Sequence, residues 1–352
     1  MSRRGIIKPG YTRSIDFKNG CIEMVHGSGG RAMAQLIHQL FLTAFDNEYL
    51  RKMNDQACFQ SFNGRMVIST DSHVITPLFF PGGDIGSLSI HGTINDIAMS
   101  GAKPSYLAAS FILEEGFPLS DLKRIVDSMA NAAHAAQVPI VTGDTKVVEK
   151  GSGDGVFITT TGIGMVPEGI NISSENARPG DKILVSGTLG DHGIAIMALR
   201  ENLSFHTSIT SDTAALHDLV AHMITAAPDI HVLRDPTRGG VATALNEIAL
   251  RSSVGMMLYE NKLPIREQVH AACEFLGLDP LYIANEGKLI AICTAEDSMN
   301  LLNAMRTHPL GENAAIIGEI IPDTHCFVQM QTRFGGKRVV DWLSGEQLPR
   351  IC

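Results

Sequence analysis

The middle of the chain contains a segment, residues 167–181, whose composition disfavours regular structure. Proline, glycine, asparagine and serine recur in it, and these residues favour turns and loops. On both sides, short apolar runs alternate with stretches that have the apolar spacing of an amphipathic helix. A chain of 352 residues also exceeds the size at which one hydrophobic core usually stops growing. We therefore expect an α/β protein with two domains that meet at this segment.

Apolar periodicity places the main elements. In the first half we expect strands at 66–72, 105–113, 138–141 and 156–165 and a helix at 120–137; in the second half, strands at 182–185 and 289–293 and a helix after Gly240. The predicted organisation is an N-terminal extension (1–20), an N-terminal domain (21–168), a C-terminal domain (169–335) and a flexible C-terminal tail (336–352).

Charge and cysteine content exclude several classes of protein. The net charge is -9 and the pI is about 5.8, which argues against nucleic acid or an anionic membrane as the main partner. No apolar run is long enough to span a bilayer, and the basic extension lacks the apolar core of a signal peptide. Six cysteines include no C-x-x-C pair, so we expect reduced thiols in a cytoplasmic protein, with Cys273 on a helix and Cys293 in a buried strand.

A glycine-rich loop precedes the first helical pattern. It consists of His26, Gly27, Ser28, Gly29 and Gly30. Such a loop can present backbone N–H groups to a phosphate while the helix end adds partial positive charge. A flexible turn explains the same residues equally well, and the spacing fits neither a Walker loop nor a dinucleotide fingerprint.

Three aspartates of the first half are candidate metal ligands. We expect Asp71 and Asp144 at strand ends and Asp96, next to Asn95, on a helix. Magnesium prefers oxygen ligands and bridges phosphates through one or two carboxylates. Lys146, two residues after Asp144, would then contact a phosphate. Each aspartate taken alone is more often a cap or a turn residue.

The second half adds a possible base and a possible anion site. Glu286 lies in Asn285-Glu286-Gly287-Lys288, just before a strand, and could accept a proton; an ion pair with Lys288 is equally compatible with the pattern. His192 lies in a glycine-rich turn, where local backbone contacts are the commoner role of a histidine. Arg234 and Arg238 flank a helix start and could bind an anion or pair with Asp235.

The chain ends in Leu348-Pro349-Arg350-Ile351-Cys352, after a stretch that contains several glycines. At about 3.3 Å per residue, a fully extended tail could reach roughly 50 Å. A thiol on such a tail could enter more than one pocket, because chain ends are poorly ordered unless they are tied down. The alternative is that Cys352 is incidental.

Taken together and in order, these motifs resemble the HypE family of nickel-iron hydrogenase maturation proteins. The resemblance runs from about Cys21 to Cys352 and rests on the glycine-rich loop, Ser69-Thr70-Asp71-Ser72, Asn95-Asp96, Gly143-Asp144-Thr145-Lys146, Arg234-Asp235-Pro236-Thr237-Arg238, Asn285-Glu286-Gly287-Lys288 and Pro349-Arg350-Ile351-Cys352. It implies the two-domain fold of aminoimidazole ribonucleotide synthetase, with mixed sheets packed against helices, and a homodimer joined through the N-terminal domains.

The resemblance also implies a reaction. Such proteins receive a carbamoyl group on the terminal cysteine from the carbamoyltransferase HypF. They then use ATP and Mg²⁺ to dehydrate the S-carboxamide to a thiocyanate, and the cyano group passes to iron on the HypC–HypD scaffold.

Carried over residue by residue, the resemblance makes Cys352 the modified residue. Asp71, Asp96 and Asp144 would hold magnesium. The glycine-rich loop and Lys146 would surround the phosphates, with Asn95 and Thr142 among the nucleotide contacts. Glu286 is the first candidate for the base of the elimination, with Lys146 and His192 behind it.

Two other functions fit the same residues. The enzyme could activate an oxygen of a diffusible amide or carbonyl compound, in which case the terminal thiol has no role. Alternatively, the chain is a nucleotide-regulated scaffold that displays Cys352. An assay of protein without its tail distinguishes the first alternative from the dehydratase, because the tail is then not needed. ATP turnover that depends on a carbamoylated tail distinguishes the dehydratase from the scaffold.

Overall fold

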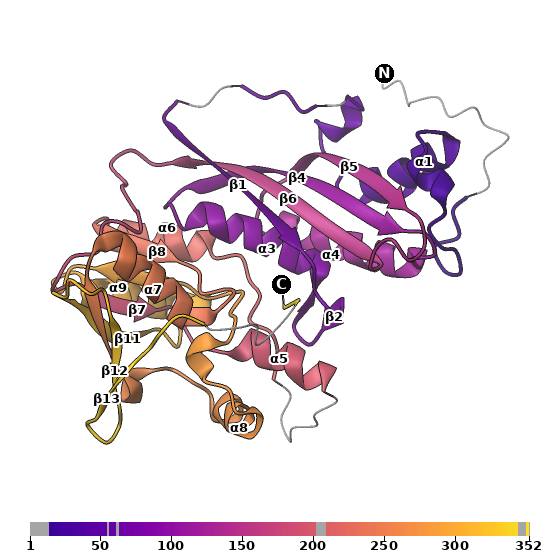
Figure 1. Ribbon diagram of the computed structural model, residues 1–352. Helices are drawn as coiled ribbons and strands as arrows, with labels where there is room; N and C mark the ends of the chain where they lie inside the picture. The colour runs from indigo at the N-terminus through magenta and orange to yellow at the C-terminus, as the bar shows by residue number, and fades with distance from the viewer. Residues whose placement is uncertain (1–13, 55, 61–62, 202–208, 344–349, 352) are drawn as a thin grey trace.

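The computed structural model describes residues 14–54, 56–60, 63–201, 209–343 and 350–351. Two lobes follow each other along the chain, each built on its own sheet (Figure 1). This confirms the expected α/β class and its two-part organisation. The proposed boundary at residue 168 lies in the fully described connection 167–181, which contains no helix or strand.

The N-terminal lobe contains a four-stranded sheet in the order β1–β6–β4–β5. Strand β6 pairs antiparallel with β1 and β4, whereas β4 and β5 are parallel. Helices α3 and α4 cover one face of the sheet, and no helix of the described residues covers the opposite, open face (Figure 1). The bounds are β1 (Arg65–His73), β4 (Lys103–Glu114), β5 (Ile140–Val148), β6 (Val156–Val166), α3 (Ile85–Ala98) and α4 (Leu119–Ala135).

Helix α3 is the central element of this lobe. Its start is fixed by a reciprocal cap, in which the Ser87 N–H donates to the Asp84 carboxylate at 2.9 Å and the Asp84 N–H donates to Ser87 Oγ at 3.2 Å. Nearly all its side chains are buried, because it packs against the sheet and α4 and also contacts α6 (His217–Ala226) of the other lobe. Residues of α3 can therefore reach both lobes.

Short helical segments precede the sheet and pack beside β5. They are η1 (Met24–Gly27), α1 (Arg31–Leu36), η2 (Ile37–Phe41), α2 (Leu42–Ala44) and η3 (Leu50–Lys52). A small hairpin, β2 (Phe79–Phe80) with β3 (Gly83–Asp84), leads into α3. The predicted extension 1–20 is described only from residue 14.

The C-terminal lobe contains a seven-stranded sheet in the order β13–β12–β9–β11–β7–β10–β8, in which only β12 and β9 are parallel. Separate apolar cores lie on its two faces, one against α7 and the other against α6 and α9. The bounds are β7 (Lys182–Val185), α5 (Asp191–Arg200), β8 (Ile230–Arg234), α7 (Gly240–Ser252), β9 (Gly255–Tyr259), η4 (Glu260–Lys262), α8 (Glu267–Leu276), η5 (Pro280–Tyr282), β10 (Ile290–Cys293), α9 (Ser298–Thr307), η6 (Pro309–Gly311), β11 (Ala315–Ile321), β12 (Val328–Gln331) and β13 (Lys337–Val339).

The expected cysteine environments are confirmed, since Cys273 lies buried on α8 and Cys293 lies buried on β10. No helix in the described part of the chain is both long and apolar enough to cross a bilayer.

The strands that carry the predicted aspartates are longer than expected. Strand β1 continues to His73, and β5 runs from Ile140 to Val148 rather than ending at Val141. The prediction that Asp144 lies at a strand end was therefore wrong, whereas Asp71 lies two residues before the end of β1, close to the expected position. Strands β6 and β4 provide backbone partners along the whole of these segments, so pairing extends past the apolar run that indicated each strand.

Candidate functional site

The glycine-rich loop packs directly onto β5. A side chain at Gly27 would place its Cβ 2.8 Å from Cβ of Val147, so only glycine allows this approach. The His26 ring is buried and its Nδ1 accepts a hydrogen bond from the Glu23 N–H at 2.9 Å, which fixes the loop from inside. The loop therefore lies on the strand that carries Thr142, Asp144 and Lys146.

A pocket of about 450 Å³ lies between this strand and the N-terminal helices. Its floor is the segment Ile140–Thr145, which includes Thr142 and Asp144. Its wall is aromatic and aliphatic, formed by Met33, Ile37, Phe41, Phe45 and Tyr49 among others. An apolar chamber next to polar strand residues is typical of sites for small organic ligands. The aromatic wall could not be predicted from the sequence, because its residues have the spacing of an ordinary buried helix stripe.

Asp144 and Lys146 form an ion pair at the edge of this pocket, with Nζ and Oδ2 2.9 Å apart. Both side chains are more than half exposed. The hydrogen bond from Lys146 is the main cause that lowers the pKa of Asp144. Since exposed pairs contribute little to stability, the pair is available to a ligand at small cost.

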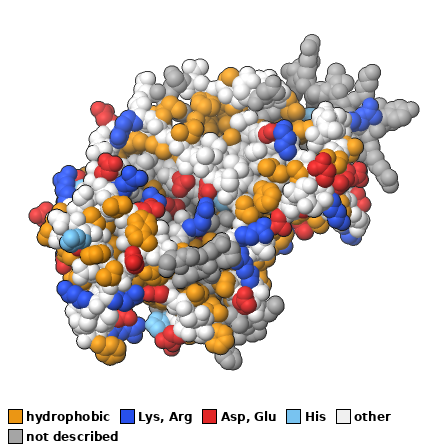
Figure 2. All heavy atoms as spheres, viewed as in Figure 1, with side chains coloured by type: hydrophobic (Ala, Val, Ile, Leu, Met, Phe, Trp, Pro, Cys, Tyr) orange, Lys and Arg blue, Asp and Glu red, His pale blue; other side chains and the backbone are white. Residues whose placement is uncertain are grey.

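A second group of acids lies between the lobes. It comprises Asp71, Asp96, Asp212, Asp235 and Glu286, which we call the interlobe acids. Figure 2 shows acidic and basic side chains together in the hollow between the lobes. Asp71 lies on the helix-covered face of the sheet, with its Oδ2 3.3 Å from His73 Nε2, and Asp96 accepts a hydrogen bond from Ser69 Oγ at 2.7 Å.

Burial and mutual repulsion raise the pKa values of several interlobe acids. Burial, with a smaller contribution from Asp96, raises the pKa of Asp235 to about 7. Burial also raises the pKa of Asp96, which the charge of Asp71 raises further. The pKa of Glu286 is raised well above its ordinary value, first by burial and then by the neighbouring acids. Such concentrated carboxylates are common at functional sites.

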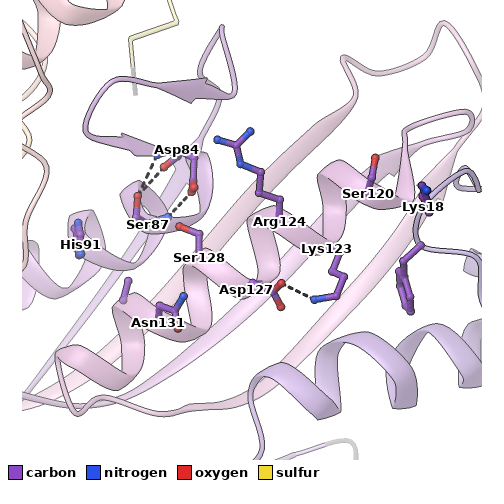
Figure 3. A pocket seen from close by; sticks show the side chains of 12 residues that line it. Lys18, Asp84, Ser87, His91, Ser120, Lys123, Arg124, Asp127, Ser128 and Asn131 are labelled. Carbon is purple, nitrogen blue, oxygen red and sulfur yellow. Dashed lines mark hydrogen bonds and ion pairs between the residues drawn. The ribbon is translucent and has the colours of Figure 1, made fainter. Parts of the chain in front are cut away.

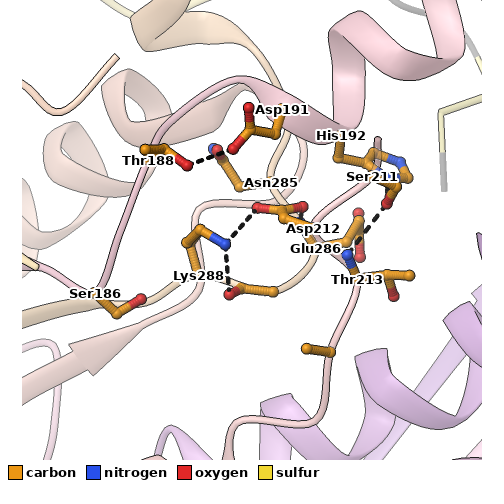
Figure 4. Close-up of polar contacts among 12 residues, drawn as sticks. Ser186, Thr188, Asp191, His192, Ser211, Asp212, Thr213, Asn285, Glu286 and Lys288 are labelled. Atoms are coloured by element: carbon orange, nitrogen blue, oxygen red, sulfur yellow. Dashed lines mark hydrogen bonds and ion pairs between the residues drawn. The ribbon is translucent and has the colours of Figure 1, made fainter. Parts of the chain in front are cut away.

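Asp235 and Asp212 were not among the predicted site residues. Asp235 was considered only as an ion-pair partner, and Asp212 has no sequence signature. The position of Asp212 depends on the fold: it accepts a hydrogen bond from the Glu286 N–H at 3.0 Å and pairs with Lys288 at 3.3 Å (Figure 4). Among the described residues, Lys288 thus pairs with Asp212 and not with Glu286. Glu286 Oε1 is buried and has no hydrogen-bond partner among the described residues.

Asn95, on α3 of the N-terminal lobe, forms hydrogen bonds with the C-terminal lobe. Its side-chain amide donates to the carbonyls of Ala214 at 3.0 Å and Glu286 at 3.2 Å, and its Oδ1 accepts from the Leu216 N–H at 2.7 Å. These contacts explain how α3 of one lobe holds the Glu286 loop of the other. The predicted contact between Asn95 and a nucleotide stays a prediction.

His192 lies at the start of α5, where it meets the end of the chain. Its Nδ1 is 2.7 Å from Ser211 Oγ, and its Nε2 is 2.8 Å from the backbone oxygen of Ile351. Burial lowers the pKa of His192, so the neutral ring is favoured. Cys352, the predicted modified residue, lies outside the described residues; Ile351, the residue before it, contacts His192 and belongs to the same apolar cluster as Ala284, which precedes the Glu286 loop.

The two groups of predicted residues are separate within one chain. Across the sheet, Asp71 pairs with Thr160, Thr160 with Ala109, and Ala109 with Gly143. Three strand spacings correspond to about 14 Å, and Asp144, one residue further on, points to the opposite face. Among the described residues, no three His, Cys, Asp or Glu side chains gather closely enough to hold a metal ion. The structure thus brings Asp71 near Asp96 but does not bring Asp144 to them.

A larger groove, of about 750 Å³, lies beside α4 and contains none of the predicted residues. Figure 3 shows its polar lining, in which Lys123 pairs with Asp127 at 2.5 Å. The Arg124 guanidinium stacks on the Phe79 ring at 3.8 Å. These charged groups are therefore already engaged with one another or with the protein.

Comparison with known proteins finds a matching domain family for each lobe. The N-terminal domain of AIR synthase related proteins matches residues 53–166, and the C-terminal domain of the same proteins matches residues 178–331. Carbamoyl dehydratase HypE of Cupriavidus necator is 68% identical over 349 residues, which cover 99% of this chain and 99% of that protein.

Solved structures agree with this comparison. The hydrogenase maturation protein HypE in complex with ATP has a TM-score of 0.90 and 50% identity, covering 94% of this chain and 99% of the other. The HypE chain of a HypE–HypF complex has a TM-score of 0.78 and 52% identity, covering 88% of this chain and 99% of the other.

Proposed function

Since the chain belongs to the HypE family of carbamoyl dehydratases, we propose that it uses ATP to convert an S-carboxamide on its own Cys352 into a thiocyanate. The product provides the cyanide ligand for the iron of nickel-iron hydrogenases. The reaction takes place in the cytoplasm, and the carbamoyl group comes from HypF. The HypC–HypD complex receives the cyano group.

The chemistry proceeds in two steps. The carboxamide oxygen attacks the γ-phosphorus of ATP, which forms an iminophosphate on the sulfur-bound carbon and releases ADP together with one N–H proton. Removal of the remaining N–H proton then breaks the carbon–oxygen bond, expels phosphate and leaves S–C≡N. The protein must therefore position a phosphoryl donor, stabilise negative charge and accept a proton.

The observation that carries this proposal is the position of the chain end. Ile351 is only 3% exposed, and its carbonyl meets His192 within the same cluster as the Glu286 loop. A chain end is rarely buried unless something binds it.

ATP occupies the pocket beside β5 in this proposal. The aromatic and aliphatic wall receives the base, while the backbone of His26–Gly30 and the side chains of Thr142 and Lys146 contact the phosphates. Asp144 orients Lys146 through their ion pair.

Magnesium fits the interlobe acids. It is commonly held by one or two carboxylates, with waters and phosphates as the other ligands, so a pair of aspartates suffices. Asp71 and Asp96 would hold it, because the charge of Asp71 already raises the pKa of Asp96 and a cation would relieve that repulsion. The ion would neutralise charge on the phosphates. Asp144, the third predicted ligand, lies about three strand spacings away in the same chain.

A homodimer explains this separation. The open sheet face carries exposed Met66, Ile68 and Ile112, and Figure 2 shows hydrophobic side chains over the upper face of this lobe. Strands β1 and β5 are the two edges of the sheet. If a second copy packs its open sheet face against that of the first, the two sheets can close into a barrel. The β5 edge of one copy then lies next to the β1 edge of the other. The partner subunit's nucleotide then lies near the interlobe acids of this chain.

Glu286 is the proposed base of the elimination. Its Oε1 atom is buried and has no hydrogen-bond partner among the described residues, and burial, together with the neighbouring acids, raises the pKa of Glu286 well above its ordinary value. Lys146 is paired with Asp144, and both ring nitrogens of His192 are engaged, so neither offers a free lone pair in this arrangement.

The proposed reaction is tested by mass spectrometry of the C-terminal peptide. We expect carbamoylated protein with ATP and Mg²⁺ to lose the mass of one water molecule from that peptide and to form ADP in equal amount. Carbamoylated protein with a non-hydrolysable ATP analogue is the control. A peptide of unchanged mass after ATP addition contradicts the function.

Asp144→Ala is expected to weaken Mg²⁺-dependent ATP binding by about tenfold to hundredfold, the range for losing one contact to a charged group. Calorimetric titration with ATP and Mg²⁺ measures the effect. The matched control is Asp127→Ala, which removes another largely exposed aspartate from an ion pair of the same lobe. Equal ATP affinity in the two variants would remove Asp144 from the nucleotide site.

A further inference from the structure

The last described residues are held by more contacts than a chain end needs. The Arg350 carbonyl accepts hydrogen bonds from the Thr76 N–H at 3.3 Å and from the Arg200 guanidinium, and the Ile351 carbonyl accepts one from His192 Nε2 at 2.8 Å. Two consecutive carbonyls are thus bound by groups from both lobes. Such main-chain contacts recognise the backbone of a bound peptide whatever its side chains.

Side-chain contacts add selectivity to this backbone recognition. Ile351 belongs to the buried apolar cluster that also contains Ile75 and Phe80 of the N-terminal lobe and Ile196 and Ala284 of the C-terminal lobe. The Arg350 side chain pairs with Asp154 in the connection between β5 and β6. The backbone of Arg350 is left-handed, with φ of 55°, a conformation that an arginine adopts only when its surroundings hold it there.

His192 is oriented so that it can only donate to the chain end. A carbonyl oxygen accepts and never donates, so Nε2 carries the proton and the neutral ring offers a lone pair at Nδ1. Ser211 Oγ lies 2.7 Å from Nδ1 and donates to it, and the same oxygen accepts from the Thr213 N–H at 3.1 Å. The Phe80 ring meets the imidazole edge-on, with centroids 5.6 Å apart. Every side of the ring is thereby fixed.

We propose that Thr76, Asp154, His192 and Arg200, together with the apolar cluster around Phe80, form a tail receptor that binds the penultimate residues of the chain as a peptide ligand. The receptor reads a buried aliphatic side chain at position 351 and a cation at position 350, and His192 acts in it as a positioning residue. This inference rests on the proposed dehydration. It adds that the tail is recognised by its sequence, so the same peptide is a substrate when it is supplied in trans.

The experiment uses the full chain with Ile351→Asp, which vacates the receptor because an unpaired carboxylate is strongly disfavoured in an apolar site. Two synthetic peptides are supplied with ATP and Mg²⁺. Both carry the S-carboxamide on cysteine; one has the sequence Leu-Pro-Arg-Ile-Cys and the other has Asp in place of Ile. We expect the isoleucine peptide to lose water at millimolar concentration, the scale of a tethered tail, and the aspartate peptide to react roughly 100-fold more slowly or not at all.

Wild-type protein carbamoylated on its own tail is run beside these reactions. Equal rates for the two peptides overturn the receptor, as does an inert isoleucine peptide when wild type dehydrates its own tail. A wild-type tail that keeps its full mass instead refutes the proposed function itself, so the two failures are distinguishable.

The role of His192 has its own readout. His192→Gln keeps an N–H near the position of Nε2, whereas His192→Leu removes the donor. For a positioning residue we expect His192→Leu to raise the KM for the peptide about tenfold, the effect of one lost hydrogen bond, with little change in kcat, and His192→Gln to restore most of the loss. A fall in kcat alone, equal in both variants, would make His192 a catalytic base and contradict the positioning role.

Discussion

We expect Cys352→Ala to abolish thiocyanate formation and to leave ATP binding intact. The variant lacks the sulfur that carries the carboxamide, so it should retain no label from the carbamoyl donor. For the same reason, adding the carbamoyl donor should not stimulate its ATP hydrolysis. Two of the other thiols are poor replacements, since burial raises the pKa values of Cys273 and Cys293 to about 12 and keeps both protonated at neutral pH.

Intact mass after incubation with the carbamoyl donor measures this effect, and a titration with ATP measures binding separately. The matched control is Cys58→Ala, which removes an exposed thiol of the N-terminal lobe and should behave as wild type. If Cys352→Ala still accepts the carbamoyl group, the acceptor is another residue and the assignment of the tail fails.

We expect Glu286→Gln to lower kcat for dehydration by about 10²- to 10⁴-fold, the usual contribution of a general base. Glutamine has nearly the shape of glutamate and keeps the backbone contacts with Asp212 and Asn95, but it cannot accept the N–H proton. Single-turnover measurement with carbamoylated protein isolates this step. Glu296→Gln, an exposed change in the same lobe, is the control.

The same substitution should raise the stability of the fold. The pKa of Glu286 is higher in the folded protein than in the unfolded chain. Between the two values the folded state binds more protons, so its free energy of unfolding falls as the pH rises through that range. Glutamine removes this cost, and we expect thermal unfolding of Glu286→Gln at neutral pH at or above the wild-type temperature. A slow variant that is also less stable would indicate a structural role for Glu286 rather than a proton transfer.

The sequence predicted the elements well where local patterning decides them. The apolar spacing of residues 120–137 marks α4, and the loop-forming residues of 167–181 mark the connection between the two sheets. It was less reliable at strand ends. Val141 closes the apolar run of β5, yet the strand continues to Val148 because β4 lies parallel to it and supplies hydrogen bonds along that length.

The sequence predicted the candidate site residues from their residue types, but it did not predict which of them lie close together. Asp71, Asp96 and Asp144 look alike in the sequence. Only the order β1–β6–β4–β5 shows that Asp144 lies at the far edge of the sheet from Asp71. Asp235 lies near Asp96 only because the C-terminal lobe packs against α3. The contacts of Asn95 with the C-terminal lobe likewise depend on this packing.

The chain end shows the same division. The sequence by itself determined the family, the fold class and the presence of a terminal thiol after Pro349-Arg350-Ile351, because these depend on the identity and order of residues. Only the tertiary structure decided that Ile351 is buried, that His192 donates to its carbonyl and that Glu286 is a buried carboxyl with a raised pKa. Burial and electrostatic repulsion arise between residues far apart in the chain, and no local pattern records which of them meet.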